Sequence, residues 1–254
     1  MKNSMSDVFP DPELPPENAV DVWVIEQDRL AALPINFEAL LSAPERERAG
    51  RFVKARDTER FKVCRAMLRL GLAWYLHLGP REVVLTTGRR GKPRLLGNSP
   101  LHFNVTHSDG LALIAFTAVG DVGIDVEIPG RDVEALEIAS AYFTENETAR
   151  IAAAGAEGEQ ASTFLRFWTR KEAVLKAAGL GIAEGLNMID VSGEPPRLVQ
   201  LGGEGADALW LVQDIEGIDG VIGAVAAPPG NWSIRLWRFS AATERRFFAS
   251  FPGV

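Results

Sequence analysis

Two carboxylates one residue apart form the first candidate site. Asp125 and Glu127 flank Val126 in the segment VGIDVEI, residues 122–128. The alternation predicts a strand, in which alternate side chains share a face, so both carboxylates should project together. Their repulsion requires a solvated face, a basic partner or a divalent cation such as Mg²⁺, which completes its shell with water and substrate phosphates. From this spacing, a solvated sheet edge and a metal site both remain open.

A second candidate set lies on FLRFWTRKEAVLKAAG, residues 164–179. On a helix, Trp168, Glu172 and Lys176 recur at a spacing of four and share one face, with Lys171 alongside. A carboxylate and an ammonium placed together would complete a site for a metal and a phosphate, if this helix packs against the strand of the first pair. The alternative is an exposed, weakly stabilising Glu–Lys pair beside a core tryptophan.

Two further segments are suited to phosphate binding. Thr106 and His107 lie near the expected end of the strand HFNVTHS, residues 102–108, where hydroxyl and imidazole groups can hydrogen-bond a phosphate. The turn RRGKPR, residues 89–94, combines a glycine that permits close approach, a lysine and a proline that fixes the bend. A turn histidine with ordinary hydrogen bonds and a simple turn are the alternatives.

Positive charge is concentrated in one segment. The net charge of the chain is −7, yet residues 45–94 carry a net +9 and the remainder −16. The overall balance argues against a nucleic-acid-binding or membrane-coating surface. The basic segment is either a solvated face or a site for a polyanionic small molecule or an acidic protein partner.

Composition narrows the class of protein. With 254 residues, of which 46% are hydrophobic and 24% charged, the chain can form one large globular domain or two modest ones. Its apolar stretches are shorter than the roughly 20 residues of a membrane-spanning helix. The N-terminus lacks the apolar core of a secretory signal, and a single cysteine, Cys64, cannot form an internal disulfide. We therefore expect a cytoplasmic protein.

The hydrophobic pattern predicts an α+β fold. Helices followed by strands occur twice, which indicates two α+β halves that meet near residue 121: a flexible leader (1–17), an N-terminal half (18–121) and a C-terminal half (122–254). The segment 102–128 is typical of a β-meander. We predict strands at 21–27, 83–88, 102–108, 111–119, 122–128, 186–191, 197–202, 208–214, 220–226 and 232–239, and helices at 57–78, 133–141, 146–154 and 160–178.

Four motifs taken together resemble a known family. GKP (91–93), FNVTHS (103–108), VGIDVE (122–127) and FWTRKEAVLKAAG (167–179) are similar, in order and spacing, to the signature of 4'-phosphopantetheinyl transferases of the surfactin-synthetase-activating (Sfp) type. The resemblance implies two similar α/β halves related by pseudo-twofold symmetry, with the active site in the cleft between them. It also implies transfer of the phosphopantetheine arm of coenzyme A to a serine of an acyl, peptidyl or aryl carrier protein, with release of adenosine 3',5'-bisphosphate.

The resemblance further implies roles for individual residues. Asp125, Glu127 and Glu172 would hold Mg²⁺ on the coenzyme A pyrophosphate, and Glu172 would take the proton from the carrier serine. The groups implied to act in catalysis are Glu172, Lys176 and His107. Coenzyme A is implied to contact Arg46, Arg48, Arg51, Arg60, Gly91, Lys92, Pro93, Thr106, His107, Lys171 and Lys176.

Two residues depart from the family pattern. Thr106 stands where serine is common and keeps the hydroxyl. Asp109 is unfavourable beside an anionic ligand, so we expect it to point out of the pocket. We expect a monomer that binds coenzyme A and carrier proteins but neither nucleic acid nor membranes; a non-catalytic coenzyme A-binding protein and a metal-dependent phosphohydrolase are the rival functions.

Overall fold

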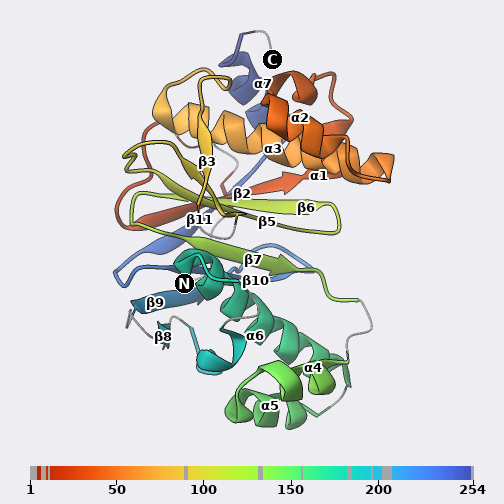
Figure 1. Cartoon of the computed structure of the whole chain (residues 1–254), viewed down its shortest axis with the longest axis vertical. Helices are drawn as coiled ribbons and strands as arrows, with labels where there is room; N and C mark the ends of the chain where they lie inside the picture. The colour runs from red at the N-terminus through yellow and green to blue at the C-terminus, as the bar shows by residue number, and fades with distance from the viewer. Residues whose placement is uncertain are drawn as a thin grey trace.

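Two β-sheets lie face to face between two long helices in the computed structural model of the chain (Figure 1). The structure describes residues 5–6, 10, 12–88, 91–130, 134–155, 157–181, 185–195, 197–201 and 208–252. Helix α3 (Ala55–Leu76) covers the outer face of the first sheet, and helix α6 (Glu157–Ala178) covers the outer face of the second. The arrangement has four layers, helix, sheet, sheet and helix.

The first sheet has five strands in the order β1-β11-β2-β6-β5. The central strand β2 pairs antiparallel with β6 and parallel with β11, which comes from the end of the chain. The strands are β1 (Met5–Ser6), β2 (Ala19–Glu26), β5 (His102–Ser108), β6 (Leu111–Thr117) and β11 (Ser233–Arg238).

The second sheet is fully antiparallel, with the order β7-β10-β9-β8. Its strands are β7 (Gly123–Glu127), β8 (Arg197–Leu201), β9 (Ala208–Asp214) and β10 (Ile222–Ala227). A separate hairpin joins β3 (Leu85–Thr87) to β4 (Pro93–Leu95).

Shorter helices flank the four layers. Helices α2 and α5 each begin with a capping box, Ser42 with Glu45 and Thr144 with Glu147, in which side chains and backbone N–H groups satisfy one another. The shorter helices are α1 (Gln27–Ala31), η1 (Phe37–Leu40), α2 (Ala43–Ala49), α4 (Ala135–Tyr142), α5 (Glu145–Ala152), η4 (Leu186–Met188) and α7 (Ala241–Ala249). No helix in the described ranges is long and apolar enough to cross a membrane.

Three apolar clusters separate the layers. Trp23, with Phe116 at a ring-centroid distance of 5.0 Å, is part of the cluster between the first sheet and α3. Aliphatic side chains such as Val22, Ile124 and Val225 fill the space between the sheets. A third cluster lies between α6 and the second sheet. Because the central strands β2, β6 and β10 are buried on both faces, they read as nearly continuous apolar runs.

The two halves repeat one topology. In the order β2, α3, β5, β6, the first strand pairs antiparallel with the last, which pairs with the one before it. The order β7, α6, β9, β10 has the same pairing, and both long helices contain 22 residues. The prediction of an α+β fold with two similar halves is therefore confirmed.

The structure differs from the predicted boundaries in the last segment. Strand β11 joins the first sheet, and Phe247 of α7 packs 5.4 Å from the ring of Trp23. The last segment of the C-terminal half predicted as 122–254, which contains β11 and α7, therefore belongs to the first half, because the apolar face of α7 is buried there. In the leader (1–17), β1 pairs with β11, and Trp74 donates a hydrogen bond to the Pro10 carbonyl at 3.2 Å, so this leader is partly anchored.

Three predictions of local structure were wrong. Residues 102–128 do not form one meander, because β7 leaves β6 and opens the second sheet. The strand predicted at 186–191 is the short helix η4 followed by irregular chain, and Pro93 and Arg94, predicted as part of a turn, begin strand β4. The peptide groups of 186–191 serve a different purpose, since Lys171 binds two of the carbonyls.

Gly123 brings β7 against the backbone of α6. A Cβ at this position would lie 1.9 Å from the Ala173 carbonyl oxygen and 2.4 Å from the Ala177 nitrogen. We expect Gly123→Ala to lower the free energy of unfolding by about 1–3 kcal/mol, because the helix must move away from the strand. Urea unfolding measures this. The control is Gly158→Ala near the start of α6, where a Cβ meets open space and the same measurement should show no loss; equal losses would contradict the close approach.

Candidate active site

A ladder of polar side chains joins β5 to β7, which belong to different sheets. Alternate side chains of β5 face the second half and make three hydrogen bonds: Asn104 Oδ1 accepts from Ile124 N–H at 3.0 Å, Thr106 Oγ1 donates to Asp125 Oδ1 at 2.9 Å, and Ser108 Oγ donates to Glu127 Oε2 at 3.0 Å. The period of two in both strands gives the ladder its spacing. It sets both carboxylates of the first candidate pair at the boundary between the halves.

Helix α6 adds an ammonium and a third carboxyl group to this boundary. Lys176 Nζ lies 2.6 Å from Asp125 Oδ1 and 3.4 Å from Thr106 Oγ1, and it donates to the Ile124 carbonyl at 3.2 Å. Glu172 lies one turn earlier on the helix and is buried. Burial raises the pKa of Glu172 to about 7; the charge of Lys176 lowers this pKa, and the charges of Asp125 and Glu127 raise it. The structure thus brings together the groups that sequence reasoning placed on separate elements.

Two buried carboxylate oxygens at this boundary lack a partner. Asp125 Oδ2 and Glu172 Oε1 make no hydrogen bond within the described part of the chain. A buried carboxylate oxygen without a donor is costly, so the pair fits a bound cation. No group of three or more His, Cys, Asp or Glu among the residues described is arranged to hold a metal ion. In this arrangement Lys176 neutralises Asp125, and Ser108 binds Glu127.

A pocket of about 550 Å³ opens beside the ladder, on the face of β5 opposite Thr106. The residues that define it include Arg48, Arg60, Phe61, Gly91, Pro93 and His107. Cations, an imidazole, an aromatic ring and a glycine–proline turn provide the groups that a nucleotide phosphate and its base require. A larger neighbouring pocket of about 1200 Å³ is lined by Arg46 and Arg48 and shares Gly91 and Pro93.

Arg60 is held by two carboxylates. Its guanidinium donates to both oxygens of Asp28, at 2.8 and 2.7 Å, and to Asp109 Oδ1 at 3.3 Å. These hydrogen bonds hold the pKa of Asp28 well below its usual range. Asp109 was expected to point away from the pocket, but it lines the pocket because it binds Arg60. Arg51 lies at the surface, where it pairs with Glu47 at 2.5 Å.

Lys92 binds protein rather than an open pocket. Its ammonium donates to the carbonyls of Val122 at 3.1 Å, Lys176 at 2.7 Å and Ala177 at 3.3 Å. These bonds use all three of its N–H donors and satisfy carbonyls at the C-terminus of α6. Burial lowers the pKa of Lys92 to about 8. The sequence-based expectation that Lys92 contacts the nucleotide therefore does not fit its position.

Lys171 also points away from the candidate site. Its fully buried ammonium pairs with Glu147 Oε2 at 2.7 Å and donates to the carbonyls of Leu186, at 2.5 Å, and Ile189. With its three donors used, it has none for coenzyme A, which corrects the role that the resemblance implied. The reason is helical geometry: consecutive residues on a helix project about 100° apart, so Lys171 does not share the face on which Glu172 and Lys176 approach β7.

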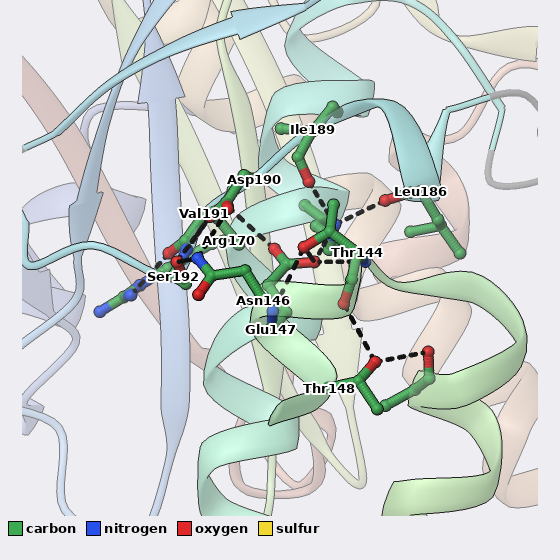
Figure 2. Close-up of polar contacts among 12 residues, drawn as sticks. Thr144, Asn146, Glu147, Thr148, Arg170, Leu186, Ile189, Asp190, Val191 and Ser192 are labelled. Carbon is green, nitrogen blue, oxygen red and sulfur yellow. Dashed lines mark hydrogen bonds and ion pairs between the residues drawn. The ribbon is translucent and has the colours of Figure 1, made fainter. Parts of the chain in front are cut away.

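Glu147 is a functional residue that sequence reasoning missed. Figure 2 shows it between α5 and the segment 186–192, where it accepts from the N–H groups of Thr144, at 3.0 Å, and Val191, at 2.9 Å. The motif TENE, residues 144–147, is a capping box and could have indicated the start of α5. Its second use, as the partner of a lysine 24 residues later, had no local signal. The pair fixes α5, the 186–192 segment and α6 to one another.

Comparison with known proteins agrees with this architecture. Residues 34–118 match the N-terminal domain of 4'-phosphopantetheinyl transferase, and residues 121–226 match the 4'-phosphopantetheinyl transferase superfamily. The 4'-phosphopantetheinyl transferase HetI of Nostoc is 34% identical over 225 residues, which cover 87% of this chain and 92% of the relative. The chain belongs to this superfamily. It is therefore a transferase.

Two other relatives place the chain within the superfamily. The 4'-phosphopantetheinyl transferase Sfp of Bacillus subtilis is 28% identical over 155 residues, covering 61% of this chain and 67% of the relative. The human L-aminoadipate-semialdehyde dehydrogenase-phosphopantetheinyl transferase is 32% identical over 181 residues, covering 65% of this chain and 59% of the relative. The resemblance identified from the motifs is confirmed, and coenzyme A is the substrate that this superfamily uses.

The Glu147–Lys171 pair should be a large contributor to the stability of this transferase. We expect Lys171→Met to lower the free energy of unfolding by about 3–5 kcal/mol, because it leaves the buried carboxylate of Glu147 without its counter-charge. The double variant Glu147→Gln with Lys171→Met should lose less free energy of unfolding than Lys171→Met alone. Urea unfolding compares both with Lys62→Met, which removes two ion pairs at the surface, with Glu38 and Glu59, and should cost less than about 1 kcal/mol. A small loss for Lys171→Met alone would contradict the assigned pairing.

The raised pKa of Glu172 predicts a pH-dependent stability. Between the ordinary pKa of 4.5 and about 7, the folded transferase keeps a proton that the unfolded chain releases. The contribution of this carboxyl group to stability is therefore complete below pH 4.5 and is lost as the pH rises to about 7. Relative to Glu172→Gln, the wild-type free energy of unfolding should fall across this range in metal-free buffer. Parallel pH profiles for the two proteins would contradict the assignment.

Proposed function

We propose that this transferase moves the 4'-phosphopantetheine arm of coenzyme A to a serine of an apo acyl, peptidyl or aryl carrier protein. The products are the holo carrier protein and adenosine 3',5'-bisphosphate. The observation that carries the proposal is the pair of unpartnered, buried oxygens of Asp125 and Glu172 beside Lys176. A phosphate with its counter-ion would satisfy all three groups. We further propose a cytoplasmic monomer as the working form.

Asp125, Glu127 and Glu172 are the residues that would hold Mg²⁺. The donor set is composed of carboxylate oxygens, which this hard cation prefers. Bound there with coenzyme A, Mg²⁺ would offset the charge of the pyrophosphate. Deprotonation of Glu172 is required for such binding, so affinity should increase as the pH rises through about 7.

Different residues of this chain then carry out different parts of the transfer reaction. The serine oxygen forms a bond to the β-phosphorus of coenzyme A, while the bond from that phosphorus to the bridging oxygen breaks and adenosine 3',5'-bisphosphate leaves. Glu172, which lies one turn of α6 before Lys176 and faces the same boundary, takes the serine proton. Lys176 supplies positive charge beside Asp125, where it would stabilise charge on the phosphoryl group and the leaving group.

The nucleotide end of coenzyme A fits the pocket beside β5. Arg48 and His107 line it and are suited to the 3'-phosphate, and the Gly91–Pro93 turn lies at its wall. Arg60 contributes there only as part of its contact with Asp28 and Asp109. Arg46 lies in the adjoining pocket. Lys92 and Lys171 support α6 in this proposal and do not bind the substrate.

Intact mass spectrometry of a carrier protein tests the function directly. Apo carrier incubated with this protein, coenzyme A and Mg²⁺ should gain the mass of phosphopantetheine, and the same carrier with its serine changed to alanine should not. No gain across acyl, peptidyl and aryl carriers, despite coenzyme A binding, would favour a non-catalytic binding protein. Release of bisphosphate without any carrier would favour a phosphohydrolase.

The same assay tests the catalytic groups. Lys176→Ala should lower kcat about a hundredfold or more, with a smaller change in the KM for coenzyme A, because its charge matters most in the transition state. Asp125→Asn should abolish the Mg²⁺-dependent rate. Arg245→Ala is a matched loss of positive charge on α7, at the opposite end of the layers from α6, and should leave the rate unchanged (Figure 1). Retained transfer in Lys176→Ala would remove its assigned role.

A further inference from the structure

The corner between α2 and α3 exposes apolar and basic side chains together. Residues 50–56, with the sequence GRFVKAR, are all exposed, and they contain three cations and no acidic residue. Val53 is 100% exposed, and Phe52 is 38% exposed. Single exposed apolar residues are ordinary on protein surfaces, but an adjacent apolar pair flanked by cations is typical of a contact surface. Two of the flanking cations, Arg51 and Arg56, also pair with Glu47 and Asp28 at the edges of the corner.

The corner has a fixed backbone. The Phe52 N–H donates to the Ala49 carbonyl at 3.4 Å at the end of α2, and the Asp57 N–H donates to the Lys54 carbonyl at 3.0 Å at the start of α3. The Phe52 ring packs 5.3 Å from the ring of Phe61, over which Arg48 lies at 5.4 Å. The exposed position of Val53 is therefore set by its anchored neighbour Phe52 and does not depend on the ordering of a loop.

Position links this corner to the candidate site. Phe52 lines the same pocket as His107, whose neighbour Thr106 binds Asp125. A protein that contacts Val53 would thus lie at the rim of the pocket proposed for coenzyme A. The rest of the chain outside residues 45–94 carries a net −16, so an acidic partner is repelled by most of the molecule and attracted to this segment.

We propose that residues 50–56 are a docking surface for the carrier protein, and that they receive a face of it with acidic residues around an apolar spot. This inference rests on the proposed function, because the carrier is its substrate. Val53 supplies the apolar contact and Lys54 the opposing charge, while Arg51 and Arg56, which pair with Glu47 and Asp28 at the surface, can exchange these partners for carboxylates of the carrier. Charge complementarity should accelerate the encounter, while burial of Val53 should slow dissociation.

The experiment compares Val53→Asp with Leu198→Asp. Leu198 is 54% exposed on β8, in the other half, and so controls for a new charge at an exposed apolar position. With an acidic apo carrier, Val53→Asp should raise the KM for the carrier about tenfold, the effect of losing one buried aliphatic side chain and adding a repulsive charge. The KM for coenzyme A and kcat should stay within about twofold of the wild type, and Leu198→Asp should match the wild type throughout.

Three results would overturn the docking surface. An unchanged KM for the carrier would do so, as would a rise confined to the KM for coenzyme A, which would assign Val53 to the coenzyme pocket. A change in oligomeric state on gel filtration would assign the surface to a second copy of this chain. Lys54→Glu gives an independent reading, because it should weaken the dependence of the carrier KM on ionic strength.

Fluorescence anisotropy separates failure of docking from failure of the proposed function. Labelled apo carrier should bind the wild type more tightly than Val53→Asp, whether or not transfer takes place. Transfer by the wild type with equal carrier binding by both proteins would overturn docking alone. Absence of transfer with binding that depends on Val53 would support docking and overturn the proposed reaction.

Discussion

The close approach of α6 to β7 at Gly123 is the constraint on which the rest of the site depends. Only a residue without a Cβ fits there, because the Ala173 carbonyl lies where the Cβ would be. This contact brings Lys176 within 2.6 Å of Asp125 and places Glu172 against the same strand. If α6 lay farther from β7, Lys176 and Glu172 would lie too far from Asp125 for the three groups to form one site.

Buried charges then fix the rotation and the axial position of α6. Lys171 binds Glu147 on one side, Arg170 binds Asp214 through two bonds of 2.7 and 2.6 Å, and Lys92 holds the carbonyls at the C-terminal end. Each cation has its donors used by protein acceptors. At the face toward β7 the balance differs, because two carboxylate oxygens within the described ranges lack partners. The charged groups that hold α6 thus have protein partners, and the unpartnered oxygens lie where the helix meets the candidate site. This is expected for a preorganised active site.

The sequence predicted the parts of this arrangement that are locally encoded. Alternation along 122–128 and the spacing of four between Glu172 and Lys176 gave the strand, the helix and the faces that meet. It could not give the partners of Lys171 and Lys92, since those are set by segments distant in the sequence that pack only in the folded chain. The family resemblance assigned both lysines to coenzyme A because a motif records which residue is present and not the direction of its side chain. The prediction that Asp109 points out of the pocket failed for the same reason, because its contact with Arg60 sets the direction of its side chain.

The return of β11 and α7 to the first half also affects how the chain acquires its structure. Strand β11 lies between β1 and β2, and Phe247 packs against Trp23, so residues more than 200 positions apart complete one core. During synthesis, the N-terminal segments emerge well before the strand that completes their sheet. The β2 edge that β11 covers therefore stays unpaired until β11 has been synthesised, and closure between segments so distant in the sequence is slow. The two halves repeat one topology, yet the sheet of the first half is complete only when a strand that follows the second half has joined it.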